Sequence, residues 1–137
     1  MKKILITLSV VALIFIGTYL LDYIKEKSFI EEFNLKLKKR EDVIEKIKSK
    51  TLSLDENNNV ILSDDYSDIA VNNYIHIFVF NEKEKLLSFL YKPGFPDEDQ
   101  YIFYTSNGIQ LIQKYVAESM YCEIKKIKDN WYFVQYN

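Results

Sequence analysis

The sequence predicts an α+β protein in which a long N-terminal helix precedes a mainly antiparallel sheet. An uncharged apolar run is followed by apolar residues at helical spacing, and from residue 51 the apolar residues alternate as they do in strands. We expect about five to seven short strands and one possible further helix in this last part. The expected parts are a membrane anchor (1–21), an amphipathic helical stalk (22–50) and a small globular β-rich domain (51–137).

The apolar run at residues 4–21 reads ILITLSVVALIFIGTYLL and contains no charged residue. A helix rises about 1.5 Å per residue, so the run would cover about 27 Å, close to the thickness of the bilayer hydrocarbon. A cleaved signal peptide has a similar basic start, but its apolar stretch has only about 7–15 residues and ends in a small-x-small cleavage site. No such site follows Gly17. We therefore prefer an uncleaved signal-anchor to a removed signal peptide.

Basic residues flank the run on both sides. Lys2 and Lys3 precede it, and a second basic group follows between Lys25 and Arg40. Positive residues near a span favour the cytoplasmic side, so the two groups compete. Because a short basic start is typical of a translocated signal-anchor, we expect residues 51–137 to lie on the extracytoplasmic side of the cell membrane.

Residues 22–50 are expected to continue the helix. Their apolar residues recur at steps of three and four, at Tyr23, Ile30, Phe33, Leu37, Ile44 and Ile47. Two interpretations fit this spacing, namely self-association through residues 23–47 as a coiled coil, or a stripe that covers the following sheet. The polar interruptions at Glu26 and Arg40 favour the covering stripe.

Strand patterns fill most of the remaining chain. In the segment from Tyr74 to Phe80 both alternating faces are apolar, which predicts a central strand. Further strands are expected at residues 51–54, 60–63, 86–91, 101–105, 121–127 and 131–136. Residues 109–119 are ambiguous, because Asn107-Gly108 is a typical hairpin turn whereas the apolar spacing after it is helical. We expect a helix there.

The composition excludes several classes of function. The formal net charge is −2 and Arg40 is the only arginine. Nucleic-acid binding draws most of its affinity from clustered Lys and Arg, so we expect no nucleic-acid partner. The chain has 3 glycines, and no phosphate-cradling loop is present in it. We expect no cofactor. Cys122 is the only cysteine, so no internal disulfide can form.

His76 and Cys122, the single histidine and the single cysteine, are the candidate catalytic residues. A thiolate–imidazole pair could support hydrolysis, but no activating motif surrounds Cys122. We expect both side chains to be structural, with the thiol buried, and we expect no enzymatic activity.

A metal site is also not expected. Asp55, Asn57 and Asn59 match the first ligands of a calcium loop. However, Val60 stands where that loop needs glycine and Tyr66 where it needs a bidentate glutamate. The other acidic groups, at residues 64–68 and 97–99, are interpreted as solvated loops.

The candidate interaction residues lie in the acidic loop at residues 97–99 and just after it, namely Asp97, Glu98, Asp99, Tyr101 and Tyr104. Tyrosine is enriched in binding hot spots, although it also favours strands. We expect a membrane-tethered, non-enzymatic binding or accessory protein whose partner is another protein of the cell envelope. The alternatives are a protective, immunity-type or inhibitory membrane protein, and a small Cys/His hydrolase.

Overall fold

The computed structural model describes residues 2–79, 83–93, 99–117 and 122–136, with the side chains described from Ser9 onward. Two compact units divide the chain, Met1–Leu37 and Lys38–Asn137. One helix, α1 (Lys2–Lys48), runs through the first unit and into the second.

The first unit is helical throughout its described length, as the anchor and stalk patterns predict. Its apolar side chains are largely exposed, with Phe15 at 71% and Tyr19 at 74%. Farther along, Lys36 Nζ pairs with Glu32 Oε1 at 2.8 Å, and the Phe29 and Phe33 rings lie 6.5 Å apart. Among the residues that the structure describes, no helix has an apolar stretch long enough to cross a membrane.

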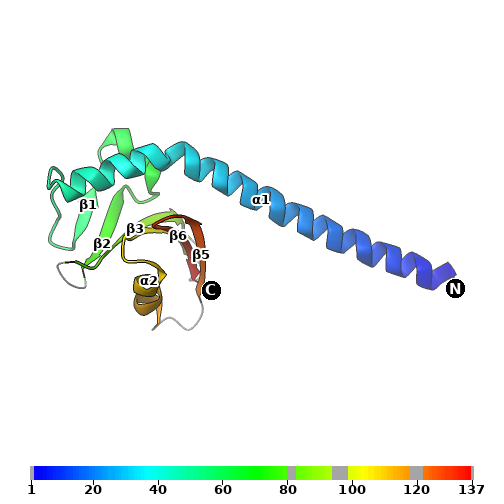
Figure 1. The fold of residues 1–137 in the computed structure, drawn as a ribbon. Coiled ribbons are helices and arrows are strands. Elements are labelled where there is room, and N and C mark those ends of the chain that lie inside the picture. The colour runs from blue at the N-terminus through cyan, green and yellow to red at the C-terminus, as the bar shows by residue number, and fades with distance from the viewer. Residues whose placement is uncertain (1, 80–82, 94–98, 118–121, 137) are drawn as a thin grey trace. The chain divides into compact units, whose positions relative to one another are not determined.

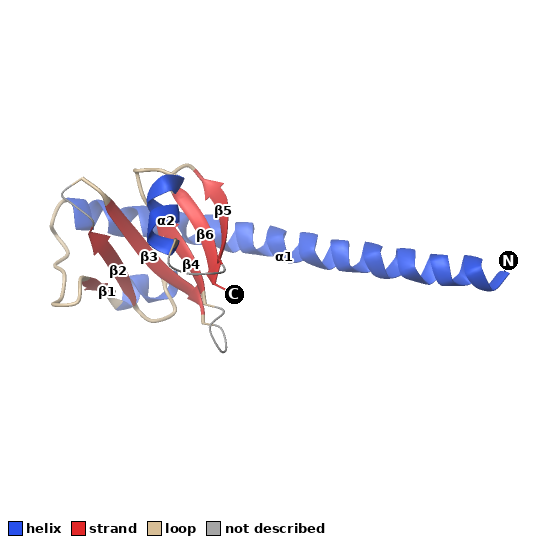
Figure 2. Ribbon diagram, turned by 90° about the horizontal axis from the view of Figure 1, so that it is seen from below, coloured by secondary structure: helices blue, strands red, loops and turns tan. Residues whose placement is uncertain are grey.

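The second unit is built on an antiparallel sheet. Among its described residues six strands pair in the order β1-β2-β3-β4-β6-β5 (Figure 2). The elements after α1 are β1 (Asn59–Ile61), the 3-10 helix η1 (Asp64–Ile69), β2 (Tyr74–Val79), β3 (Lys85–Lys92), β4 (Gln100–Tyr104), α2 (Ile109–Val116), β5 (Cys122–Lys128) and β6 (Trp131–Tyr136). The α+β class and the antiparallel sheet are therefore confirmed.

The sheet has a helix on each face. Residues 38–48 of α1 lie over one face and α2 lies over the other (Figure 1). Ile44 of α1 is buried and Ile47 is half-buried, as the covering-stripe interpretation predicts, and Val43, which the predicted stripe does not include, is buried as well. On the opposite face α2 packs Leu111, Ile112 and Val116 into a cluster with residues from four strands, Leu86, Phe103, Tyr132, Val134 and the partly buried Ile124.

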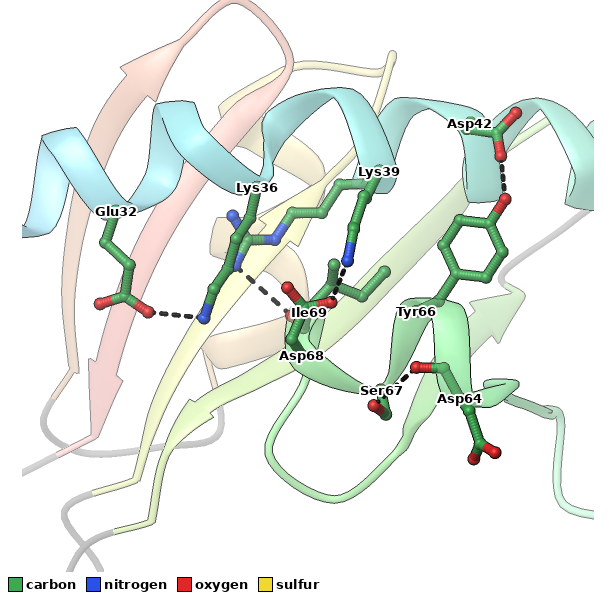
Figure 3. Close-up of polar contacts among 10 residues, drawn as sticks. Glu32, Lys36, Lys39, Asp42, Asp64, Tyr66, Ser67, Asp68 and Ile69 are labelled. Atoms are coloured by element: carbon green, nitrogen blue, oxygen red, sulfur yellow. Dashed lines mark hydrogen bonds and ion pairs between the residues drawn. The ribbon is translucent and has the colours of Figure 1, made fainter.

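Polar contacts attach α1 to η1 (Figure 3). Lys39 Nζ lies 2.9 Å from Asp68 Oδ1, and the Tyr66 hydroxyl donates to Asp42. Arg40, read from the sequence as an interruption of the apolar stripe, is 1% exposed, and its Nη2 donates to the Ile69 carbonyl at 3.4 Å. The exposed pairs contribute little stability, whereas removing a hydrogen-bonded buried group is costly.

The expected strand at residues 51–54 is wrong. That segment is irregular, because the amides of Thr51 and Leu52 donate to the Lys46 carbonyl at 2.9 and 3.3 Å and are not available to a strand. The helix expected at 109–119 is confirmed over Ile109–Val116 as α2, and residues 118 and 119 lie outside the described residues. The strands expected at 121–127 and 131–136 correspond to β5 and β6, which pair antiparallel, and β6 lies inside the sheet between β4 and β5.

Candidate functional site

The C-terminal end of α1 determines the shape of the candidate site. Lys50 has a φ of 58°, in the left-handed region, and its amide donates to the Ile47 carbonyl at 3.1 Å. The Thr51 amide donates to the Lys46 carbonyl at 2.9 Å. These two bonds form a Schellman motif, in which glycine is the usual residue at the left-handed position. The motif turns the chain sharply at the end of the helix.

A pocket of about 560 Å³ lies beside this turn. Its walls come from the end of α1, from residues 50–54, and from β2, β3 and β4. Sites for small molecules usually have volumes of about 300–1,000 Å³, so the pocket has the size of a ligand site.

The floor of the pocket is apolar because a row of paired strand residues forms it. Ile77 of β2 pairs with Leu87 of β3, and Leu87 pairs with Tyr104 of β4. Directly paired residues point to the same face of a sheet, here the face that carries α1. The apolar lining residues are Ile44, Ile47, Leu52, Leu54, Ile77, Val79 and Leu87. Most of this set is buried or half-buried, but Leu54 and Val79 remain 45% and 49% exposed.

Four exposed lysines line the same pocket, namely Lys48, Lys50, Lys83 and Lys85. Lys48 Nζ lies 2.8 Å from Glu45 Oε1 and 5.7 Å from the centre of the Tyr104 ring. The hydrogen bond to Glu45 raises the pKa of Lys48, so this ammonium group stays charged. The described lining residues include no aspartate and no glutamate. The pocket therefore combines an apolar floor with a positively charged rim.

Of the candidate interaction residues, Asp99, Tyr101 and Tyr104 are described, and the two tyrosines lie on opposite faces of the sheet. Asp97 and Glu98 lie outside the described residues. Asp99 and Tyr101 are in contact, since the Tyr101 hydroxyl donates to Asp99 Oδ2 at 3.1 Å. The pKa of Tyr101 is raised to about 12, mainly by burial and secondly by the hydrogen bond to this carboxylate. Tyr101 packs with the α2 cluster, whereas Tyr104 lines the pocket on the other face.

His76 and Cys122 are far apart in the sheet. His76 lies on β2 and Cys122 on β5, and β3, β4 and β6 lie between them. Four strand spacings of about 4.8 Å separate such positions by about 19 Å. His76 Nδ1 instead lies 2.7 Å from Asn59 Oδ1. The two side chains thus form no dyad, and Cys122 is half-buried, where full burial was expected.

The segment 55–59, which resembles the start of a calcium loop, forms a turn that is held by hydrogen bonds from its own backbone amides. The carboxylate of Asp55 accepts the amides of Asn57 and Asn59 at 2.8 and 2.7 Å. The hydrogen bond from the Asn59 amide is the main cause that lowers the pKa of Asp55. Within the described parts of the chain, no group of three or more His, Cys, Asp or Glu side chains is placed to hold a metal ion.

The lysine rim is the feature that sequence reasoning missed. Its members form two Lys-x-Lys patterns, at residues 48–50 and 83–85. Each pattern alone is typical of a solvated helix end or turn. Only the fold shows that both border one pocket.

Comparison with known proteins adds no assignment. No family model, no curated protein and no solved structure matches this chain.

Proposed function

We propose that the protein is a membrane-tethered, non-enzymatic binding module of the cell envelope, and that the pocket is its binding site. The observation that carries the proposal is the apolar floor under a rim of exposed lysines. Concave apolar sites with a few convergent polar groups are where ligands usually bind.

The helical N-terminal part supports the tether. From Ser9 to Leu21 the described residues carry no charge, form a continuous helix and expose their large apolar side chains. Each square ångström of apolar surface removed from water is worth about 25 cal/mol, so a bilayer would stabilise this surface strongly. With the uncharged residues before Ser9, the run reaches the length of a span. The extracytoplasmic side remains our expectation for the second unit.

The chemistry of the pocket supports binding over catalysis. A nucleophilic lysine needs a lowered pKa, whereas hydrogen bonding raises the pKa of Lys48. The described lining residues also include no histidine and no cysteine. A charged rim of this kind is suited to holding a ligand by electrostatic attraction.

Site-specific crosslinking in intact membranes tests the binding site. A photoreactive phenylalanine analogue at Leu54 faces the pocket, and the same analogue at Ile61, which is 71% exposed on the edge strand β1, is the matched control. We expect an adduct of defined mass from position 54 and none of that mass from position 61. Equal products from both positions, or none from either, would contradict the proposal.

Extraction of membranes with alkaline carbonate tests the tether. The unmodified chain should stay in the membrane, and Phe15→Arg should release it because a charge at the centre of a span is costly. Leu35→Arg is the control, since Leu35 is 81% exposed but lies outside the apolar run. Release of the unmodified chain, or equal retention of both variants, would contradict a transmembrane anchor.

A further inference from the structure

We infer that the pocket binds a small anionic amphiphile, a molecule with one phosphate, sulfate or carboxylate head group on a single apolar tail. This inference rests on the proposed function and adds the chemical class of the ligand. Its two parts, the charge and the tail, follow from different groups in the pocket.

The charge of the ligand follows from the rim. Lys48 ends α1 and Lys50 lies in the turn after it, while Lys83 precedes β3 and Lys85 begins it, so two separate segments bring cations to one pocket. Glu45 is paired with Lys48, and Glu84 stands between Lys83 and Lys85 in the chain, so the four lysines of the pocket outnumber these two carboxylates. Like charges gathered in one place repel one another, and a bound anion removes this repulsion. Lysine ammonium groups bind phosphate and carboxylate as point charges on flexible stems.

The tail follows from the floor. Leu54 and Val79, which line the pocket together with the buried Ile77 and Leu87, are 45% and 49% exposed. An inorganic anion would contact the lysines and leave this apolar surface in water. An apolar tail covers it and gains the free energy of burial. The volume of about 560 Å³ is that of a small-molecule site, which favours a single-chain ligand over a folded partner.

The backbone of Lys50 is a second, independent observation. Its φ of 58° is in the region where a side chain is strained and glycine is usual. The other residues with positive φ among the described non-glycine residues are Asn58, Asn73 and Asn130, and asparagine tolerates this conformation. Strained residues cluster at functional sites, and the lysine at this strained position places its charge on the rim of the pocket.

The test uses the full chain in lipid nanodiscs with ¹³C-labelled isoleucine methyl groups. The methyl groups of Ile44, Ile47 and Ile77 report binding in the pocket. The methyl group of Ile112, buried under the opposite face of the sheet, reports effects of the probe outside the pocket. The probes are hexyl phosphate, hexanol and inorganic phosphate, which separate the charge from the tail. We expect hexyl phosphate to shift the pocket methyls and to bind at least about tenfold more tightly than either other probe. The Ile112 methyl should not shift.

Substitutions at the two ends of β3 provide the matched control. Lys85→Gln removes a rim charge and should weaken hexyl phosphate binding several-fold, while hexanol binding stays unchanged. Lys92→Gln removes an exposed charge at the other end of the strand, outside the pocket, and should leave both probes unchanged. Spectra of the free variants show whether each is folded.

Three outcomes would overturn the inference. Equal binding of hexanol would show that charge is irrelevant, and equal binding of inorganic phosphate would show a simple anion site. The absence of shifts at the pocket methyls would exclude this class of ligand. If position 54 nevertheless yields a specific crosslink in membranes, the binding module stands and only the ligand class fails. If it yields none, the proposed function fails as well.

Discussion

Replacing Lys50 by glycine should stabilise the protein while weakening its pocket. Lys50 occupies the left-handed position of the Schellman motif that ends α1, with a φ of 58°. A Cβ atom in this conformation costs about 1–2 kcal/mol, which glycine avoids. Glycine also gives the unfolded chain more conformational freedom, which lowers the free energy of unfolding by about 0.4–1 kcal/mol and offsets part of this gain. The net expectation is a rise of about 0.5–1 kcal/mol in the free energy of unfolding.

The stability change is measurable with the single tryptophan of the chain. Trp131 is buried on β6, so its fluorescence follows unfolding in urea or on heating. For a domain of this size, the expected gain raises the melting temperature by about 2–8 °C. Asn73→Gly is the matched control, because Asn73 has the same φ of 58° but asparagine already tolerates it. We expect a smaller gain there.

The ligand measurement completes this prediction. Lys50→Gly removes one rim charge, so the more stable variant should bind hexyl phosphate more weakly than the unmodified chain. A Lys50→Gly variant that is less stable than the unmodified chain would refute the strain argument. A variant that is more stable and binds hexyl phosphate equally well would refute the role given to this lysine.

Three further expectations concern the sheet. Deleting residues 131–137 removes β6 from its place between β4 and β5 and should abolish the cooperative melt, because truncating the buried Trp131 alone costs about 3–5 kcal/mol. A truncated chain that melts near the full-length temperature would contradict this. Cys122→Ser should lower the free energy of unfolding, measured in urea, by no more than about 1 kcal/mol, because the thiol is half-buried. A folded variant that no longer binds the ligand would instead give Cys122 a role in the site. Because burial raises the pKa of Tyr101 to about 12, its neutral form stabilises the fold below about pH 10, and this stability is lost between about pH 10 and pH 12. Tyr101→Phe should shift alkaline unfolding, followed by fluorescence, to higher pH; an unchanged transition would disprove this assignment.

The elements that the sequence predicts well are those whose pattern is local. The strands β2, β3, β4 and β6 carry apolar residues on both faces, and α2 has a clear helical spacing, so each is recognisable within its own segment. The prediction of a strand at residues 51–54 fails for a local reason that the apolar pattern does not reveal. The end of α1 captures the amides of Thr51 and Leu52, and this depends on the left-handed Lys50, a position where glycine would have been the signal.

The candidate site was not predictable from such patterns, because it depends on strand order. The row from Ile77 through Leu87 to Tyr104 exists only because β2, β3 and β4 are neighbours in this register. The two Lys-x-Lys patterns meet only because α1 ends beside the start of β3. Conversely, two tyrosines only three residues apart in the sequence are separated, since Tyr101 and Tyr104 lie on opposite faces of the sheet.

The measurement that tests the central claim most directly is native mass spectrometry of the full chain released from its own membranes. We predict a bound species of small mass, negatively charged and with an apolar tail, on the unmodified chain. The species should be lost when Lys50 and Lys85 are both replaced by glutamine and retained in Lys92→Gln. A chain that carries no such molecule, or that carries it equally in all three forms, would contradict the claim that this pocket is the functional site.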